Sequence, residues 1–180
     1  MAEYLYELRI PKDRIAVLIG TDGKIKKELE AETKTKIDVD SKEGDIFISG
    51  EDALGLYSCR EVITAIGRGF NPEIAKLLLK SDYCFELIDL KECVGKSKND
   101  MLRIKGRVIG SEGKSRKLIE ELSEANICVY GKTIGIIGPS ESASTAREAI
   151  ERLIKGSPHS TVYKFLERKR REIKKKRSVL

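Results

Sequence analysis

Aromatic residues and histidine are scarce in this sequence of 180 residues, which has no tryptophan, one histidine and 6% aromatic residues. Stacking of bases on aromatic side chains is therefore not expected to be the main mode of binding, should the chain bind a nucleic acid. The single histidine, His159, has no serine or cysteine nearby with an evident activating partner. A structural or RNA-contacting role suits His159 better than that of a general base.

The sequence also lacks a complete nucleotide-hydrolysing motif. Gly113-Lys114-Ser115 resembles the end of a P-loop, but that motif needs a glycine five residues before Gly113, where Val108 stands. Gly131-Lys132-Thr133 fails in the same way, since Asn126 occupies the required place. We therefore expect that the chain is not an enzyme.

Paired metal ligands and long apolar runs are missing as well. Cys59, Cys84, Cys93 and Cys128 form no closely spaced pair of the kind that structural zinc sites use, so we expect reduced thiols, no metal and no cofactor. No apolar stretch reaches the roughly 18 residues that indicate a membrane span. The first residues do not read as a signal peptide. We expect a soluble, cytoplasmic protein without a membrane partner.

Charge is abundant and unevenly distributed. Lysine and arginine number 35 and the acidic residues 29, giving a net charge of +6. The net charge is −5 over residues 1–90, +4 over 91–163 and +7 over 164–177. This asymmetry fits a polyanionic partner for the second half, although a solvated basic helix would give the same composition.

The chain contains an internal duplication. A Gly-x-x-Gly sequence occurs at residues 20–23 and again 90 positions later at 110–113, followed in both copies by lysine and an apolar-periodic segment. The offset falls to 88 at Gly50 and Gly138, because the second copy has a shorter loop. A repeat of this length is too long for a solenoid unit and suits a small domain, so two domains of one fold are predicted.

Each half shows the element order strand, helix, helix, strand, strand, helix, which predicts an α+β fold. The first half gives strands at 4–10, 36–40 and 45–49 and helices at 14–19 (capped by Asp13), 24–32 and 52–70. The second half gives strands at 84–90, 127–130 and 133–137, a polar loop at 91–99, and helices at 101–109, 114–124 and 142–155. Asn71-Pro72 predicts the start of a connecting helix to residue 79, and Ser157-Pro158 the start of a basic final helix. The domains expected are residues 1–70 and 83–156, with a connecting helix at 71–82 and a basic helix and tail at 157–180.

The two Gly-x-x-Gly turns carry the strongest functional signal. Glycine removes the side chain where the backbone bends tightly and approaches a partner. A helix follows directly, so its unpaired amides and positive dipole end favour a phosphate. The arrangement resembles the type I KH family, whose Gly-x-x-Gly loop clamps four nucleotides of single-stranded RNA. That resemblance implies two tandem βααββα domains.

The second half has a more specific resemblance. GRVIGSEGKSRKLIEELSEANICVYGKTIGIIG and, above all, GSPHSTVYKFLERKRR resemble the archaeal branch of the Dim-two/Partner-of-Nob-One/Krr-one family of ribosome-assembly proteins. The resemblance implies a role in processing or assembling the small-subunit ribosomal RNA. It also links the chain to the 3′ end of that RNA and to the alpha subunit of translation initiation factor two.

Residues near the turns, the second hairpin and the tail are predicted to contact RNA. They are Gly20, Thr21, Asp22, Gly23, Lys24, Lys26, Lys27, Arg103, Lys105, Arg107, Gly110, Ser111, Glu112, Gly113, Lys114, Ser115, Arg116, Lys117, Lys132, Arg168, Lys169, Arg170 and Arg171. KH loops often carry a basic residue between the glycines, whereas Asp22 and Glu112 stand here and would repel a phosphate. The second domain, with more basic neighbours, is therefore the expected main RNA site. Two alternatives remain open: a protein-interaction scaffold with weak or no RNA binding, and an RNA-binding subunit of an RNA-degrading complex.

Overall fold

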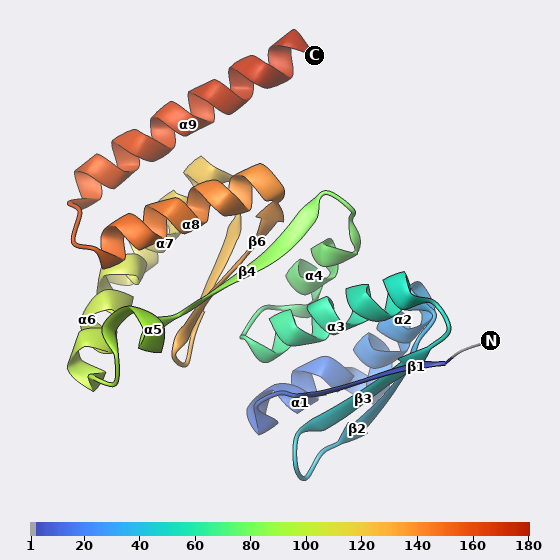
Figure 1. Cartoon of the computed structure of the whole chain (residues 1–180). Coiled ribbons are helices and arrows are strands. Elements are labelled where there is room, and N and C mark those ends of the chain that lie inside the picture. Colours follow the sequence, from blue (N-terminus) through green and yellow to red (C-terminus); the bar gives the residue numbers. More distant parts are fainter. Residues whose placement is uncertain (1–2) are drawn as a thin grey trace. The chain divides into compact units, whose positions relative to one another are not determined.

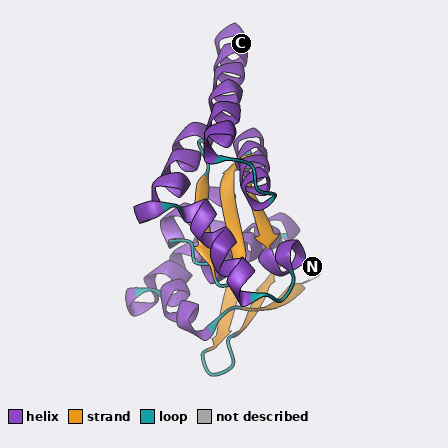
Figure 2. Ribbon diagram, turned by 90° about the vertical axis from the view of Figure 1, so that its left-hand side faces the viewer, coloured by secondary structure: helices purple, strands orange, loops and turns teal. Residues whose placement is uncertain are grey.

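The computed structural model describes residues 3–180, which divide into two compact units between Ser81 and Asp82. Each unit contains one three-stranded antiparallel sheet and its own set of helices (Figure 1). Figure 2 distinguishes the helices, strands and loops by colour. No helix of residues 3–180 is long and apolar enough to cross a membrane.

The first unit has the order β1, α1, α2, β2, β3, α3, α4. Its bounds are β1 Tyr4–Arg9, α1 Lys12–Ile19, α2 Lys24–Thr33, β2 Lys36–Asp40, β3 Asp45–Gly50, α3 Ala53–Gly67 and α4 Pro72–Ala75. The sheet order is β1-β3-β2, so the central strand is the last one in sequence. Ile37 pairs with Ile48, and both are fully buried while Asp38 is exposed. This alternation turns one face of the sheet toward the helices.

The second unit repeats the order strand, helix, helix, strand, strand, helix and adds α5 and α9 to it. Its bounds are β4 Tyr83–Asp89, α5 Leu90–Val94, α6 Lys98–Ile109, α7 Lys114–Ser123, β5 Asn126–Tyr130, β6 Thr133–Pro139, α8 Ser140–Ile154 and α9 His159–Val179. The sheet order β4-β6-β5 matches that of the first unit. Buried residues from the sheet and from α6, α7, α8 and α9 form one core cluster.

The predicted α+β class and the repeated element order are confirmed, and most ends fall within about two residues. The cap predicted for α1 is wrong: the helix begins at Lys12 directly after Pro11, whose extended backbone ends the strand, and Asp13 lies inside the first turn. The predicted polar loop at 91–99 is wrong in its first part. There Asp89 accepts a hydrogen bond from the Lys91 amide at 2.9 Å and starts helix α5.

The segment after α3 begins as predicted. Asn71 caps α4 through a 2.9 Å hydrogen bond from the Glu73 amide, with Pro72 in the first helical position. Only residues Pro72–Ala75 are α-helical, and Lys76–Leu79 continue as a tighter 3-10 turn. The domain limits at residues 70 and 83 stay predictions.

Helix α9 packs against α7 and α8 and contributes to the core of the second unit. Val162 and Leu166 are fully buried, Phe165 is 5% exposed, and the Arg152 guanidinium lies 3.9 Å from the centroid of the Phe165 ring. The first half of α9 is therefore a structural part of the unit, while its last residues, from Lys174 on, are exposed.

The packing of α9 predicts that Phe165→Ala lowers the free energy of unfolding of the second unit by about 3 kcal/mol, because it opens a cavity in the core. The neighbouring exposed residue provides the control, and Lys164→Ala should change stability by less than about 0.5 kcal/mol. Urea unfolding followed by circular dichroism measures both. Equal stability of the two variants would contradict the packing role of α9.

Candidate nucleic-acid interface

The two Gly-x-x-Gly turns have the same backbone conformation. In the first, Gly20, Asp22 and Gly23 have φ values of 73°, 53° and 72°. In the second, the corresponding values are 72°, 55° and 73°. Each turn joins two consecutive helices between the first and second strands, α1 to α2 and α6 to α7. The duplicated sequence therefore forms the same left-handed turn twice.

Close packing explains why glycine begins each turn. A Cβ atom on Gly20 would lie 2.5 Å from Cγ1 of Ile25, and one on Gly110 would lie 2.7 Å from Cβ of Ser115. Both glycines also have positive φ, which a larger residue adopts only with strain. Ser115 is 3% exposed, and its hydroxyl has no hydrogen-bond partner within residues 3–180.

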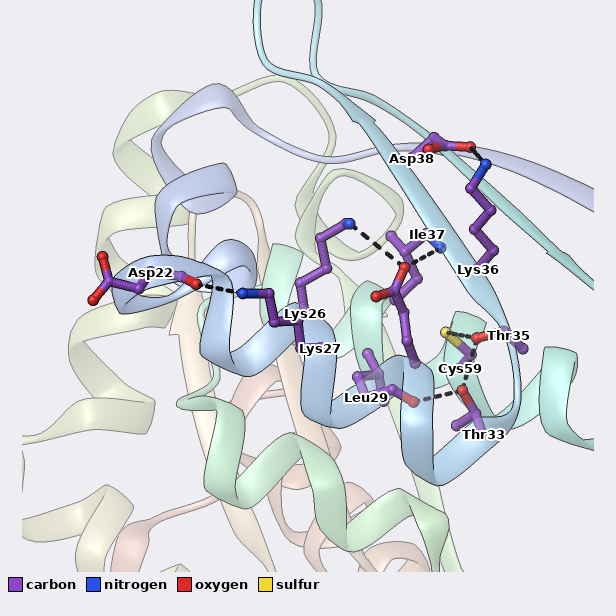
Figure 3. A network of polar contacts seen from close by, with 11 residues as sticks. Asp22, Lys26, Lys27, Leu29, Thr33, Thr35, Lys36, Ile37, Asp38 and Cys59 are labelled. Atoms are coloured by element: carbon purple, nitrogen blue, oxygen red, sulfur yellow. Dashed lines mark hydrogen bonds and ion pairs between the residues drawn. The ribbon is translucent and has the colours of Figure 1, made fainter.

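The middle of each turn faces solvent. Thr21, Asp22, Ser111 and Glu112 are exposed. The amides at the start of such a turn have no acceptor within the helix, so they can donate to an anion. In the first turn the Lys27 ammonium donates to the Asp22 carbonyl at 3.1 Å (Figure 3).

A glutamate links the helix after each turn to the neighbouring strand. Glu30 Oε1 accepts a 2.8 Å hydrogen bond from the Ile37 amide, and Glu120 Oε1 accepts one of the same length from the Ile127 amide. Figure 3 shows the first of these links. Lys26 lies 3.5 Å from the Glu30 carboxylate. Four residues apart on α7, Arg116 pairs with Glu120 at 2.8 Å. These two predicted RNA contacts therefore already have a protein partner.

Arg107 is occupied within the fold. Its Nε donates to the Leu153 carbonyl at 3.1 Å and its Nη2 to the Ser157 carbonyl at 2.6 Å. Leu153 lies in the last turn of α8, where its carbonyl also accepts from the Gly156 amide at 3.2 Å, and Ser157 follows the end of that helix. His159 Nε2 contacts the Arg107 carbonyl at 2.8 Å, which gives this histidine a structural position. Arg107 therefore has a structural role, and its contact with RNA stays a prediction.

In the first unit Arg14 makes the same kind of contact as Arg107, although it stands at another position of the repeat. Arg14 donates to the Ile66 and Phe70 carbonyls, both at 2.8 Å. These two acceptors lie 87 positions before Leu153 and Ser157, as the repeat requires. Arg14 stands six residues before its Gly-x-x-Gly turn and Arg107 three, which is about one helical turn apart. Alignment of the repeats does not match these two arginines, so sequence comparison misses their shared role.

The lysines that follow the two turns differ in their partners. In the first unit Lys24 lies 3.9 Å from Glu28, and Lys26 and Lys27 have the partners described above. In the second unit Lys114 and Lys117 are exposed, and their ammonium groups have no ion pair or hydrogen-bond partner within residues 3–180. The same holds for half-buried Lys105 and exposed Lys132, while Arg103 lies 3.7 Å from Asp100.

The tail residues predicted to bind RNA also differ in their protein partners and in their exposure. Arg168 and Lys169 lie 4.0 and 3.7 Å from the Glu172 carboxylate. Arg170 is half-buried, and its Nε has no partner within the described part of the chain. Arg171 is exposed on α9. Their contact with RNA stays a prediction.

Lys91, Lys96 and Lys98, which are not among the predicted RNA contacts, border hollows beside α6. One hollow of about 250 Å³ is lined by Lys91, Lys96, Lys98, Met101 and Lys132. A second, of about 290 Å³, is lined by Lys98, Met101, Leu102, Lys105 and Lys132. The density of lysine between residues 91 and 105 is the sequence signal that could have indicated them.

Burial raises the pKa of the Cys59 thiol, which disfavours the reactive thiolate. Within residues 3–180, histidine, cysteine and acidic side chains form no group of three or more that could hold a metal ion. The expected absence of a metal or cofactor stays a prediction.

The sheet order, the paired helices and the Gly-x-x-Gly turns define a protein with two tandem type I KH domains. The description "KH domain" matches residues 5–65, and "Eukaryotic type KH-domain (KH-domain type I)" matches residues 84–171. This chain belongs to the family of KH-domain proteins that includes archaeal Dim2 and eukaryotic Pno1. The predicted fold and family are confirmed.

Three relatives illustrate the relationship. A KH domain-containing protein of Methanocaldococcus jannaschii is 47% identical over 94% of this chain and 76% of its own length. The pre-rRNA-processing protein PNO1 of Coccidioides immitis is 32% identical over 62% of this chain, a match that spans 44% of that protein. The a/eIF2alpha-aDim2p-rRNA complex of Pyrococcus horikoshii contains a chain with 44% identity and a TM-score of 0.88, covering 94% of this chain and 96% of that one.

The occupied guanidinium of Arg107 predicts that Arg107→Gln lowers the free energy of unfolding of the second unit by about 2 kcal/mol, because two carbonyls lose a charged donor. Lys105→Gln is the matched change on the same helix. It should leave stability within about 0.5 kcal/mol of the wild type and weaken RNA binding. Urea unfolding and RNA titration separate these effects, and unchanged stability of the Arg107 variant would refute its structural role.

Proposed function

We propose that this chain binds single-stranded RNA near the 3′ end of the small-subunit ribosomal RNA and acts in the processing or assembly of that subunit. In this role it supplies binding and positioning and is not an enzyme. Its place of work is the cytoplasm. Its relatives include a pre-rRNA-processing protein and a chain in a complex with rRNA, which supports the choice of RNA.

One observation carries the assignment of the main RNA site to the second unit. Lys114 and Lys117 of α7 directly follow the second turn and have no ion-pair partner in residues 3–180. Unpaired lysines repel each other, and a polyanion relieves that repulsion while releasing counterions. The corresponding lysines of the first unit are already engaged with protein acceptors.

A second role, docking of a protein, is favoured for the first unit. A hollow there is lined by Asp38, Asp40 and Lys42 together with Phe47 and neighbouring residues, so carboxylates outnumber basic groups. Such a surface disfavours a polyanion. The relative from Pyrococcus horikoshii forms a complex with a/eIF2alpha. We propose that the alpha subunit of translation initiation factor two is a partner of this chain as well.

The two turns provide a matched test of the main RNA site. Ser111→Asp places a second carboxylate in the turn of the second unit, and Thr21→Asp makes the same change in the first. Both residues are exposed, so the fold should tolerate either change. We expect Ser111→Asp to weaken RNA binding by at least about 1 kcal/mol more than Thr21→Asp, the size of one charge-assisted contact.

Titration of both variants against one labelled oligonucleotide from the small-subunit rRNA 3′ end measures the difference, with circular dichroism as the control for folding. A larger loss from Thr21→Asp would reverse the assignment of the two units. No loss from either folded variant would favour a protein-interaction scaffold.

A further inference from the structure

The second unit contains an insertion that the first unit lacks. Tyr6 of β1 pairs with Ile48, and Glu86 of β4 pairs with the repeat equivalent, Ile136. From Tyr6 to its turn at Gly20 is 14 positions, whereas from Glu86 to Gly110 is 24. The ten additional residues form α5, the bend into α6 and an extra turn at the start of α6, which has 12 residues where α1 has 8. This segment is therefore not needed for the KH fold itself.

The inserted segment places three lysines around one hollow. Asp89 caps α5, which carries Lys91, and Gly95 ends that helix with a φ of 68°. Lys96 follows at the bend. Ser97 then caps α6 through a 3.3 Å hydrogen bond from the Asp100 amide, and Lys98 begins the helix.

The hairpin between β5 and β6 completes the hollow. The Leu90 amide donates to the Lys132 carbonyl at 2.9 Å, which fixes the start of α5 against this hairpin. Lys91, Lys96, Lys98 and Lys132 thus border the same space of about 250 Å³, with Met101 as its apolar part. Met101 is 7% exposed and belongs to the hydrophobic core of the second unit.

None of these four lysines has an ion pair in the part of the chain that the structure describes. Lysines that border one hollow without a paired carboxylate raise the local positive potential, which favours a bound anion. The hollow lies at the beginning of α6, and the Gly-x-x-Gly turn follows the end of that helix. Eleven residues of helix separate these points, a rise of about 16 Å. The adjoining hollow, which shares Lys98, Met101 and Lys132, lies along the same helix.

We propose that this lysine hollow binds a backbone phosphate of the RNA strand that the Gly-x-x-Gly turn holds. The inference rests on the proposed RNA-binding function of the second unit. A KH loop clamps about four nucleotides, so the hollow takes a phosphate beyond that clamp. The inserted segment then lengthens the RNA footprint without reading bases, because lysine contacts to phosphate carry no sequence information.

The double variant Lys91→Gln/Lys96→Gln tests this site. Both lysines are exposed and border only the first hollow, so the clamp and the fold should persist. The control, Lys155→Gln/Lys164→Gln, removes the same charge from exposed positions of the second unit that do not line the hollow. Binding is measured for oligonucleotides of increasing length from the small-subunit rRNA 3′ end, at several salt concentrations.

We expect the hollow variant to lose roughly tenfold in affinity for the long oligonucleotides and little for those confined to the clamp. Its slope of log affinity against log salt should be shallower by about 0.7 for the one phosphate lost. The control should keep the wild-type slope. Replacing one phosphate outside the clamp with a neutral methylphosphonate should weaken the wild type and have no further effect on the hollow variant.

Equal affinity and equal salt slope of the hollow variant and the control at all lengths would overturn the hollow while leaving RNA binding intact. A loss of the same size on the shortest oligonucleotides would also overturn it, since the lysines would then act on the clamp. Inorganic phosphate, added at matched ionic strength, provides a further check. If it abolished the additional affinity for long oligonucleotides without weakening the binding of short ones, the hollow would be supported as a phosphate site. Absence of RNA binding by the wild type would instead refute the proposed function.

Discussion

The close approach of each Gly-x-x-Gly turn to the helix that follows it is the constraint on which both domains depend. At Gly20 and Gly110 the space for a Cβ atom is already filled by Ile25 and Ser115. The chain can therefore turn sharply between two helices and leave the middle of the turn in solvent. Because the helix starts within this turn, its unpaired amides and the basic residues of its first turn face the same region. A binding surface for phosphate follows from the backbone geometry.

The surrounding contacts hold this turn in the same way in both units. Glu30 and Glu120 each accept a hydrogen bond from a strand amide and so fix the helix after the turn to the sheet. Arg14 and Arg107 donate to carbonyls at or just beyond the C-terminal ends of α3 and α8. The charges placed on this shared frame differ. In the first unit the lysines that follow the turn have protein partners, whereas in the second Lys114 and Lys117 have none within residues 3–180 and an inserted segment adds further lysines. One duplicated fold can in this way serve two partners of different charge.

The repeated motifs and the apolar periodicity of the strands and helices are sufficient to predict the fold class, the element order and the family. Local signals also predict the cap at Asn71 and the final helix. Helix α5 is missed because five residues are too few to show a helical periodicity, and its start depends on the Asp89 cap and on buried Leu90. The structural role of Arg107 is missed because its acceptors lie 46 and 50 positions away and its counterpart occupies another turn of the helix. Whether a lysine is paired depends on three-dimensional neighbours, so the candidate site could be predicted as a region but not residue by residue.

The central claim is that the second unit holds the small-subunit rRNA near its 3′ end. Ultraviolet crosslinking of the intact chain in its host cells, with sequencing of the attached RNA and mass spectrometry of the attached peptides, tests this most directly. The account predicts reads concentrated at the 3′ end of the small-subunit rRNA and crosslinked peptides from residues 91–132. Reads spread without enrichment over cellular RNA, or crosslinks confined to residues 1–81, would contradict it.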